Sequence, residues 1–194
     1  MTEFLDLLDW KRRVFELYAY VRSVPPKRGW HVWREGRDDL FASHAQTPNP
    51  DVKPGYFEYD PAARVLGEVV AAPEQELRLP VSTDEVVTAT RIGATRFEIG
   101  GEQASLDLFW IGGYGGGLFL PFRDETSGQS TYGAGRYLYD TIKGADLGAE
   151  DGKLVLDFNF AYNPSCAYDP RWACPLAPPN NRLGVAIEAG EKAP

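Results

Sequence analysis

The stretch "TRFEIGGEQASLDLFWIGGYGGGLFLPF", residues 95–122, decides the fold because two runs of glycine divide it into three segments with the character of strands. Gly100 and Gly101 separate "TRFEI" from "EQASLDLFWI", and both central positions of a two-residue hairpin turn favour positive φ. A second glycine run, around Tyr114, separates "LDLFWI" from "LFLPF". The stretch therefore predicts three consecutive antiparallel strands joined by two tight connections.

The second glycine run, residues 112–117, also has to be compared with loops that bind nucleotides. A P-loop needs a lysine followed by serine or threonine after its last glycine, whereas Leu118 and Phe119 follow here. A dinucleotide-binding fingerprint counted from Gly113 and Gly115 needs a third glycine where Leu118 stands. We therefore interpret this run as a structural hairpin, in preference to a loop whose glycines contact a ligand.

Two amphipathic helices are predicted before residue 45. Over residues 3–22 apolar side chains recur every three or four positions, the spacing of one helix face, and the prolines of "VPPKRG" end the helix. The same spacing returns over residues 30–43, so we expect both helices to lie on a core. The stripes consist of Leu7, Trp10, Val14, Leu17 and Val21, flanked by Phe4, Leu8, Phe15 and Tyr18, in the first helix, and of Trp30, Trp33, Arg37 and Leu40 in the second.

After the loop "AQTPNPDVKPG" the hydrophobic period drops to two, which is typical of antiparallel strands. Alternating runs occupy residues 65–69, 77–81 and 97–99, with proline, glycine and aspartate between them. We predict an α+β protein, mainly β, in which a curled antiparallel sheet, sandwich-like or a partial barrel, carries two N-terminal helices. The chain is expected to form a single domain over residues 1–194, with a helical segment over 1–45 and a β region over 55–192.

The balance of charge bears on the partners of the protein. Twenty-eight acidic against twenty basic side chains give a net charge of -8, which repels nucleic acid and anionic membranes, and no apolar run approaches the roughly 18 residues of a membrane span. We therefore expect neither a nucleic-acid nor a membrane partner. Acidic residues precede any basic cluster at the N-terminus, the wrong order for a secretory signal, and this predicts a cytoplasmic protein.

The two cysteines, Cys166 and Cys174, are too few for a disulfide scaffold and form no C-x-x-C element. A four-ligand zinc site would have to recruit both distant histidines, His31 and His44. We expect two free thiols, no metal and no cofactor.

Two segments carry a resemblance to a known family. "LFLPFRDETSGQSTYGAGRYL", residues 118–138, and "LDFNFAYNPSCAYDPRWACPLAPPNNRLGVAIEAGEK", residues 156–192, resemble the bacterial and archaeal family catalogued as domain of unknown function 1684. The resemblance runs through about residues 109–192, and "HAQTP" at 44–48 departs from the "HPQSP" common in that family. It implies one domain and a shared set of motifs, without an agreed activity.

Candidate site residues are the polar side chains in or beside the predicted strand ends between Arg123 and Arg182. In "LVLDFNFAY", residues 154–162, strand alternation places Asp157 and Asn159 on one face, and Arg136 is the expected partner of Asp157. We expect the loops after residues 118–122 and 154–162 to form a polar pocket. Asp124 and Asp157 are the candidate catalytic residues, and the candidate ligand-binding residues are Thr126, Ser127, Tyr132, Arg136, Asn159, Tyr162, Asn163, Cys166 and Arg182.

Three functions fit this set of residues. The first is binding of a small anionic or polar metabolite, with an arginine holding the ligand and hydroxyls and amides orienting it. The second is a hydrolase that uses Asp124 or Asp157 as general base. The third is a structural module without a ligand, in which Arg136 or Arg182 pairs with Asp157 or Asp124 in a buried network. A Ser-His-Asp triad is disfavoured, because both histidines lie far in sequence from the candidate serines.

Overall fold

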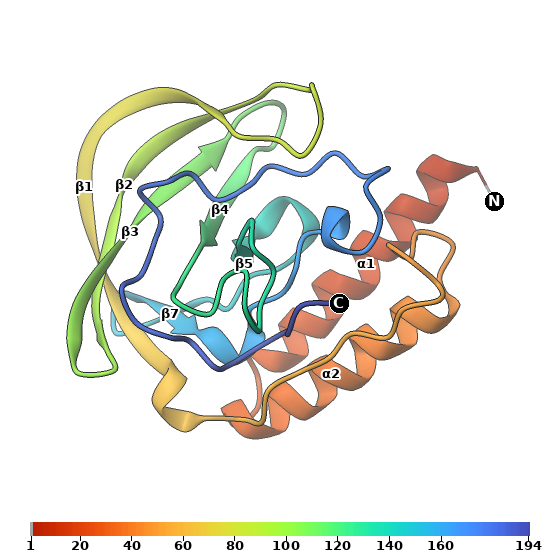
Figure 1. Ribbon diagram of the computed structural model, residues 1–194, viewed down its shortest axis with the longest axis horizontal. Helices are drawn as coiled ribbons and strands as arrows, with labels where there is room; N and C mark the ends of the chain where they lie inside the picture. The colour runs from red at the N-terminus through yellow and green to blue at the C-terminus, as the bar shows by residue number, and fades with distance from the viewer. Residues whose placement is uncertain (1) are drawn as a thin grey trace.

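The computed structural model describes residues 2–194 and has two helices followed by a seven-stranded antiparallel sheet (Figure 1). The sheet order is β5-β4-β3-β2-β1-β7-β6, so β1 to β5 form a meander and β7 and β6 extend it beyond β1. The curl of the sheet makes a half-barrel, which confirms the predicted mainly β architecture with two N-terminal helices. The elements are α1 (Glu3–Val21), α2 (Pro26–Ser43), β1 (Arg64–Leu79), β2 (Val87–Ile99), β3 (Glu102–Ile111), β4 (Gly117–Phe122), β5 (Arg136–Asp140), β6 (Ala149–Glu150) and β7 (Lys153–Asp157).

Both glycine runs form the predicted hairpins. Gly100 and Gly101 have φ values of 61° and 79°, the conformation that a two-residue turn between β2 and β3 requires. The second run connects β3 to β4, where Ile111 pairs with Gly117. Tyr114 at the tip of this connection is fully exposed.

The β1 strand is longer than its sequence suggests. We expected separate strands at 65–69 and 77–81, but β1 runs from Arg64 to Leu79 without a break. Its pairing with β2 is irregular between Ala71 and Gln75, the segment that contains Pro73. Proline is tolerated there because β7 pairs only with the first residues of β1, so that the rest of the strand has an open edge that needs no amide donor.

Side chains of the two neighbouring strands lie close to Gly67 of β1. A Cβ atom at this position would lie 2.0 Å from Thr95 Oγ1 of β2 and 2.7 Å from a methyl carbon of Leu156 in β7. Both distances are shorter than real Cβ contacts, so a larger residue would push the neighbouring strands apart. Glycine at position 67 therefore permits the close packing of β2 and β7 against β1.

The helices lie across the open side of the curled sheet, and α2 and the C-terminal half of α1 contribute side chains to its core (Figure 1). Trp30 and Trp33 are fully buried, and Trp33 packs edge-on against Phe160 at 5.4 Å between ring centroids. The prediction that the whole apolar stripe of α1 lies on the core is wrong, because Phe4 is 83% exposed and Leu7, Leu8 and Phe15 are also exposed. The first turns of α1 extend past the core, as Figure 1 shows.

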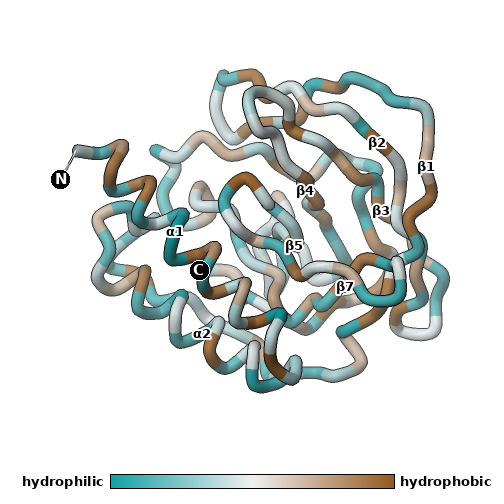
Figure 2. The backbone as a smooth tube through the Cα atoms, turned by 180° about the vertical axis from the view of Figure 1, so that it is seen from behind, coloured by the Kyte–Doolittle hydropathy of each residue, from teal (hydrophilic) through white to brown (hydrophobic). Residues whose placement is uncertain are grey.

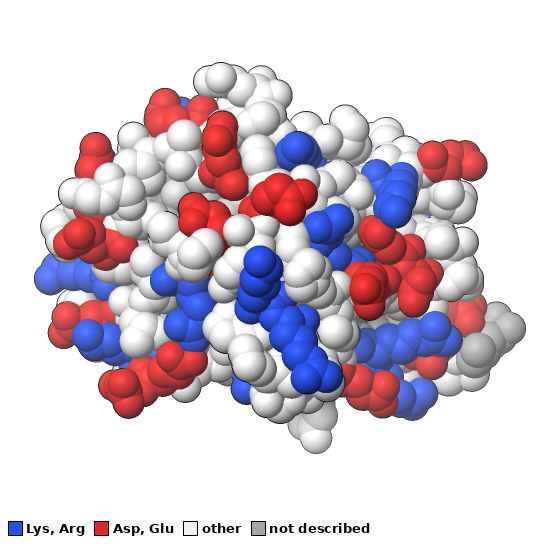
Figure 3. Space-filling model, turned by 90° about the horizontal axis from the view of Figure 1, so that it is seen from below, with Lys and Arg blue, Asp and Glu red and all other residues white. Residues whose placement is uncertain are grey.

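The outer surface is mixed in character. Along the chain, hydrophilic and hydrophobic residues alternate over α1 and α2 (Figure 2). On the face seen from below, basic and acidic side chains are interspersed, with a row of basic side chains near the centre (Figure 3). Among the described residues, no helix has the length and apolar character that crossing a membrane requires.

Candidate functional site

The guanidinium group of Arg136 is buried between β5 and the C-terminal segment. Its Nη2 atom donates to Asp124 Oδ2 at 2.7 Å and to the Ile187 carbonyl at 3.0 Å. Its Nη1 atom donates to the carbonyls of Ala189 at 2.5 Å and Glu191 at 3.1 Å. The four acceptors are one carboxylate in the loop after β4 and three backbone carbonyls of the C-terminal segment. Arg136 therefore joins β5 to both of these segments.

The expected pairing of Arg136 with Asp157 is wrong. Arg136 lies opposite Phe122 in the β4–β5 pair, which places Asp124, two residues further along, within its reach. Asp157 ends β7, and four strands separate β7 from β5 in the sheet. Sheet order, which the sequence does not reveal, decides which acid the arginine meets.

Thr126 and Ser127, two of the predicted site residues, hold the loop after β4 together with Thr131. The Thr126 amide donates to Asp124 Oδ1 at 2.6 Å, and the Thr126 hydroxyl donates to the same oxygen. Ser127 Oγ accepts the Asp124 amide at 3.0 Å, and the hydroxyls of Thr126 and Thr131 lie 2.8 Å apart. These contacts hold the loop in shape through its own side chains.

A second buried network surrounds the carboxylate of Glu191. Arg37 Nε donates to Glu191 Oε1 at 2.5 Å. The backbone amide of Asn163 and the Tyr168 hydroxyl donate to Glu191 Oε2 at 2.7 and 3.0 Å. Because the Glu191 carbonyl also accepts from Arg136, the C-terminal segment connects the two networks.

The remaining predicted ligand-binding residues are divided among separate places in the fold. Tyr162 pairs with Tyr137 through backbone hydrogen bonds, and Tyr132 lies beside Cys166. Arg182 is half exposed and donates to Glu125 at 3.1 Å. The structure therefore does not gather the predicted residues into the single pocket that we expected from the loops after residues 118–122 and 154–162.

Asp157 and Asn159 do contact each other, but not as neighbours on one face of a strand. The prediction of a continuous strand over 154–162 is wrong, because β7 ends at Asp157 and Phe158–Phe160 forms a turn of 3-10 helix. Asp157 Oδ1 accepts the Asn159 amide at 3.1 Å and its side-chain Nδ2 at 2.8 Å. Asn159 in turn accepts the Asp60 amide at 2.9 Å, which fixes the segment before β1.

The second oxygen of the same carboxylate, Asp157 Oδ2, is buried and has no hydrogen-bond partner within residues 2–194. The nearest cation is Arg64, whose Nε lies 3.9 Å away, an ion-pair distance that is too long for a hydrogen bond. The Arg64 guanidinium donates instead to Glu150 Oε1. Oδ1 of Asp157 therefore accepts two hydrogen bonds from Asn159, whereas Oδ2 accepts none among the described residues.

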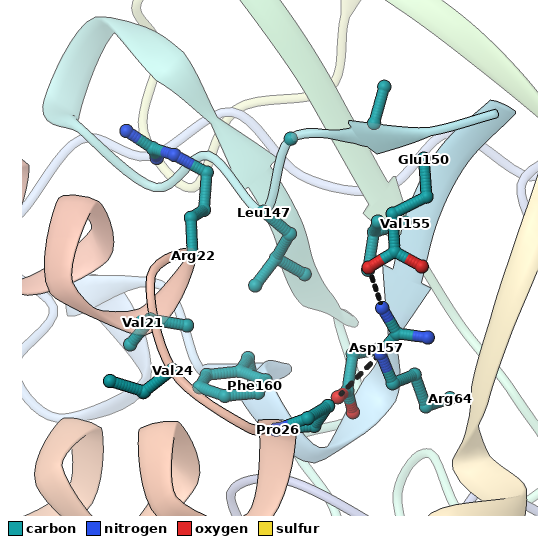
Figure 4. Close-up of a pocket in the computed structure, with 12 residues that line it drawn as sticks. Val21, Arg22, Val24, Pro26, Arg64, Leu147, Glu150, Val155, Asp157 and Phe160 are labelled. Atoms are coloured by element: carbon teal, nitrogen blue, oxygen red, sulfur yellow. Dashed lines mark hydrogen bonds and ion pairs between the residues drawn. The ribbon is translucent and has the colours of Figure 1, made fainter. Parts of the chain in front are cut away.

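Asp157 lies in the wall of a cavity of about 170 Å³, which we call the Asp157 cavity (Figure 4). In Figure 4, Arg64 bridges Glu150 and Asp157 on one side, and Val21, Val24 and Phe160 line the other. The wall combines the α1–α2 connection with residues of β1, β6 and β7. It comprises Val21, Arg22, Val24, Pro26, Arg64, Leu147, Gly148, Ala149, Glu150, Val155, Asp157 and Phe160.

The protonation of Asp157 is unusual for an aspartate. Burial raises the pKa of its carboxyl from 3.8 to about 6, although the hydrogen bonds from Asn159 and the charge of Arg64 oppose this rise. The carboxyl is therefore largely ionised at pH 7 but accepts a proton in mildly acidic solution. Perturbed carboxyl groups of this kind cluster at functional sites.

A smaller cavity of about 60 Å³ lies between the two helices, β5 and the segment after Tyr162. Tyr162, Asn163 and Asp140 line it, and the buried Asn163 Oδ1 has no hydrogen-bond partner in the described part of the chain. Burial raises the pKa of Asp140, while Lys143 opposes the rise. A space of this size suits ordered water rather than an organic molecule.

Sequence reasoning missed three charged residues of these networks. Arg37 lies on the predicted apolar stripe of α2. A charged side chain on a buried helix face needs a buried partner of opposite charge, and this was the signal that could have found the network. Glu191 and Arg64 had no comparable signal, because their partners are distant in sequence. No group of three or more His, Cys, Asp or Glu side chains within residues 2–194 is arranged to hold a metal ion.

Comparison with known proteins gives a family but no activity. The family model described as "Protein of unknown function (DUF1684)" matches residues 54–192. An NMR structure of an uncharacterised protein from Haloarcula marismortui has 34% sequence identity and a TM-score of 0.58, over 82% of this chain and 89% of that one. No curated protein sequence matches. The chain belongs to the DUF1684 family, as its motifs indicated.

Proposed function

We propose that the protein binds a small polar molecule in the Asp157 cavity, through an amine or hydroxyl group that donates to Asp157 Oδ2. One observation carries this proposal: Asp157, whose side chain is 1% exposed, lies in the wall of a cavity of about 170 Å³, and its buried Oδ2 atom has no donor among the described residues. A buried polar group without a partner costs about 1–3 kcal/mol. A ligand that supplies the donor removes this cost.

The apolar residues of the cavity wall indicate the chemical character of the rest of the ligand. Val21, Leu147, Val155 and Phe160 contribute apolar surface opposite the carboxylate. An apolar cavity of about 150 Å³ holds a benzene molecule, so a body of one ring fits the Asp157 cavity. We infer a ligand with one donor group on a compact apolar body.

Of the two ligand classes suggested by the sequence, anionic and polar, the polar class is better supported. Arg136 and Arg182 are engaged by Asp124 and Glu125. Within the cavity wall, Arg64 is already engaged by Glu150. An anion would also meet the ionised Asp157, so repulsion disfavours it.

Three probes with one ring and different head groups test the proposal: benzylamine, benzyl alcohol and benzoate. We expect the amine and the alcohol to raise the Tm of the protein and benzoate to leave it unchanged. At a hundredfold excess over Kd a ligand stabilises the folded state by about 2.7 kcal/mol. For a chain of this size that corresponds to roughly 5–10 °C in a thermal-shift measurement.

Three variants make the test specific. Asp157→Asn should lose most of the shift with benzylamine, whereas Glu68→Gln, an acid-to-amide change at an exposed position of β1, should keep it. Leu147→Trp should suppress binding of every probe, because the indole fills the cavity. If no probe shifts the Tm of the wild type, or benzoate shifts it as much as benzylamine, the proposal is wrong.

A hydrolase with Asp157 as general base is the second candidate, favoured by the pKa of about 6. Asp124 is less suited to this role, because both of its oxygens are engaged by Arg136 and Thr126. Hydrolysis of a small ester such as ethyl acetate, followed by the acid released, should rise with pH through about 6 and vanish in Asp157→Asn. Equal rates for the two proteins would eliminate Asp157 as a base.

A further inference from the structure

The two cysteines of the chain, Cys166 and Cys174, lie against each other beneath the surface. The Cys166 amide donates to Cys174 Sγ at 3.4 Å, so the sulfur of one residue touches the backbone of the other. Both are free thiols, with exposed fractions of 9% for Cys166 and 3% for Cys174. The two cysteines are therefore adjacent, and Cys166 is slightly more exposed to solvent than Cys174.

The position of Cys174 is fixed by the segment that follows β1. The Cys174 amide donates to Ser82 Oγ at 3.0 Å, and the Ser82 amide donates to the Cys174 carbonyl at 3.0 Å. Val81 and Pro175 form an isolated antiparallel bridge beside them. On the other side, the hydroxyl of Tyr132 lies 3.9 Å from Cys166 Sγ. Contacts from three segments therefore hold the two thiols together.

The two sulfur atoms differ in their surroundings. A hydrogen bond from the Cys174 thiol lowers the pKa of Cys166, and the Tyr132 hydroxyl acts in the same direction. The same thiol hydrogen bond, together with burial, raises the pKa of Cys174. These shifts favour the thiolate form at Cys166 over Cys174. This is the arrangement of a nucleophilic cysteine beside a resolving one.

We infer that Cys166 and Cys174 form a redox site that reacts with hydroperoxides. The Cys166 thiolate attacks the terminal peroxide oxygen, the O–O bond breaks, and with one proton the leaving group becomes water or an alcohol while Cys166 becomes a sulfenic acid. The Cys174 thiol then attacks the Cys166 sulfur, which forms the disulfide and releases water. Two electrons pass from the dithiol to the peroxide, and an external thiol restores the reduced pair.

The burial of the pair selects the oxidant. With Cys166 9% exposed and Cys174 3% exposed, a compact hydroperoxide reaches the sulfur more readily than a bulky disulfide such as oxidised glutathione. The site lies apart from the Asp157 cavity, whose wall contains neither cysteine. Oxidation of the cysteine pair is therefore independent of ligand binding at Asp157.

Hydrogen peroxide provides the test on the folded chain of 194 residues. Wild type should lose both titratable thiols with a mass decrease of about two hydrogens, and dithiothreitol should restore them. Its rate constant with peroxide at pH 7 should exceed that of free cysteine. Cys174→Ser should stop at a sulfenic acid that dimedone traps, and Cys166→Ser should leave Cys174 unreacted.

The Tyr132→Phe variant tests whether the Tyr132 hydroxyl lowers the pKa of Cys166 or whether Cys166 reacts only because it is accessible. Loss of the hydroxyl donor should move the pH at which half-maximal peroxide reactivity is reached upward, with both thiols still present. Three results would overturn the inference: thiols of the folded wild type that survive peroxide, a rate no higher than that of free cysteine, or oxidation by oxidised glutathione but not by peroxide.

Discussion

Replacement of Arg136 by methionine is expected to lower the free energy of unfolding by about 3–5 kcal/mol. Arg136 and Asp124 are 1% and 0% exposed, and their atoms Nη2 and Oδ2 lie 2.7 Å apart. Methionine fills similar space but leaves the Asp124 carboxylate buried without its counter-ion. It also removes the donors to the carbonyls of Ile187, Ala189 and Glu191. Urea unfolding of both proteins at pH 7 measures the difference.

Arg182→Met is the matched control for this loss. Arg182 and Glu125 form the same kind of pair at 3.1 Å, but both side chains are 49% exposed. Solvent screens such a pair, so the control should lose less than about 1 kcal/mol. Equal effects of the two substitutions would contradict a structural role for burial of the Arg136–Asp124 pair. An anion that stabilised wild type but not Arg136→Met would instead assign Arg136 to a ligand.

Asp157→Asn is expected to stabilise the protein above pH 7, by up to about 3 kcal/mol. The pKa of Asp157 is raised from 3.8 to about 6, so the folded state holds this proton more tightly than the unfolded chain. The stabilising contribution of the proton is complete below about pH 4 and is lost as pH rises through about 6. Asparagine carries no charge at any pH and retains an oxygen for the Asn159 hydrogen bonds.

The measurement is the difference in unfolding free energy between Asp157→Asn and wild type from pH 4 to 8. It should grow with pH through the interval from about 4 to 6 and then level off. Asp124→Asn should have the opposite sign at pH 7, because its carboxylate neutralises the buried Arg136. A pH-independent difference for Asp157→Asn would show that its carboxyl is not perturbed by burial.

Stabilisation by Asp157→Asn would also bear on function. A residue that lowers the stability of its own fold is retained for another reason, and binding of a donor ligand is the reason proposed for Asp157. Loss of the benzylamine shift together with a gain in stability would connect the two. A gain in stability with the shift unchanged would assign the ligand to another position.

Local sequence determined the parts of the fold that depend on nearby residues. The glycine pair at residues 100–101 required a tight turn because it favours positive φ, and the prolines after Val24 ended the first helix. The spacing of Trp30 and Trp33 indicated a buried helix face, and both side chains are buried. The motifs shared with the DUF1684 family were likewise visible in the sequence.

Tertiary structure alone decided which charged groups meet and where a cavity lies. Arg136 pairs with Asp124 rather than Asp157 because β7 joins the sheet beside β1, at the far side from β5. The end of β7 places Asp157 in the wall of a cavity built from the α1–α2 connection and from β1, β6 and β7. The cavity wall joins residues as distant in sequence as Val21, Arg64 and Asp157. Alternation along one strand carries no information about the order of strands in a sheet. The sequence thus indicated the two helices, the hairpins and the candidate residues, whereas the packing of distant strands left the buried Asp157 Oδ2 without a donor among residues 2–194.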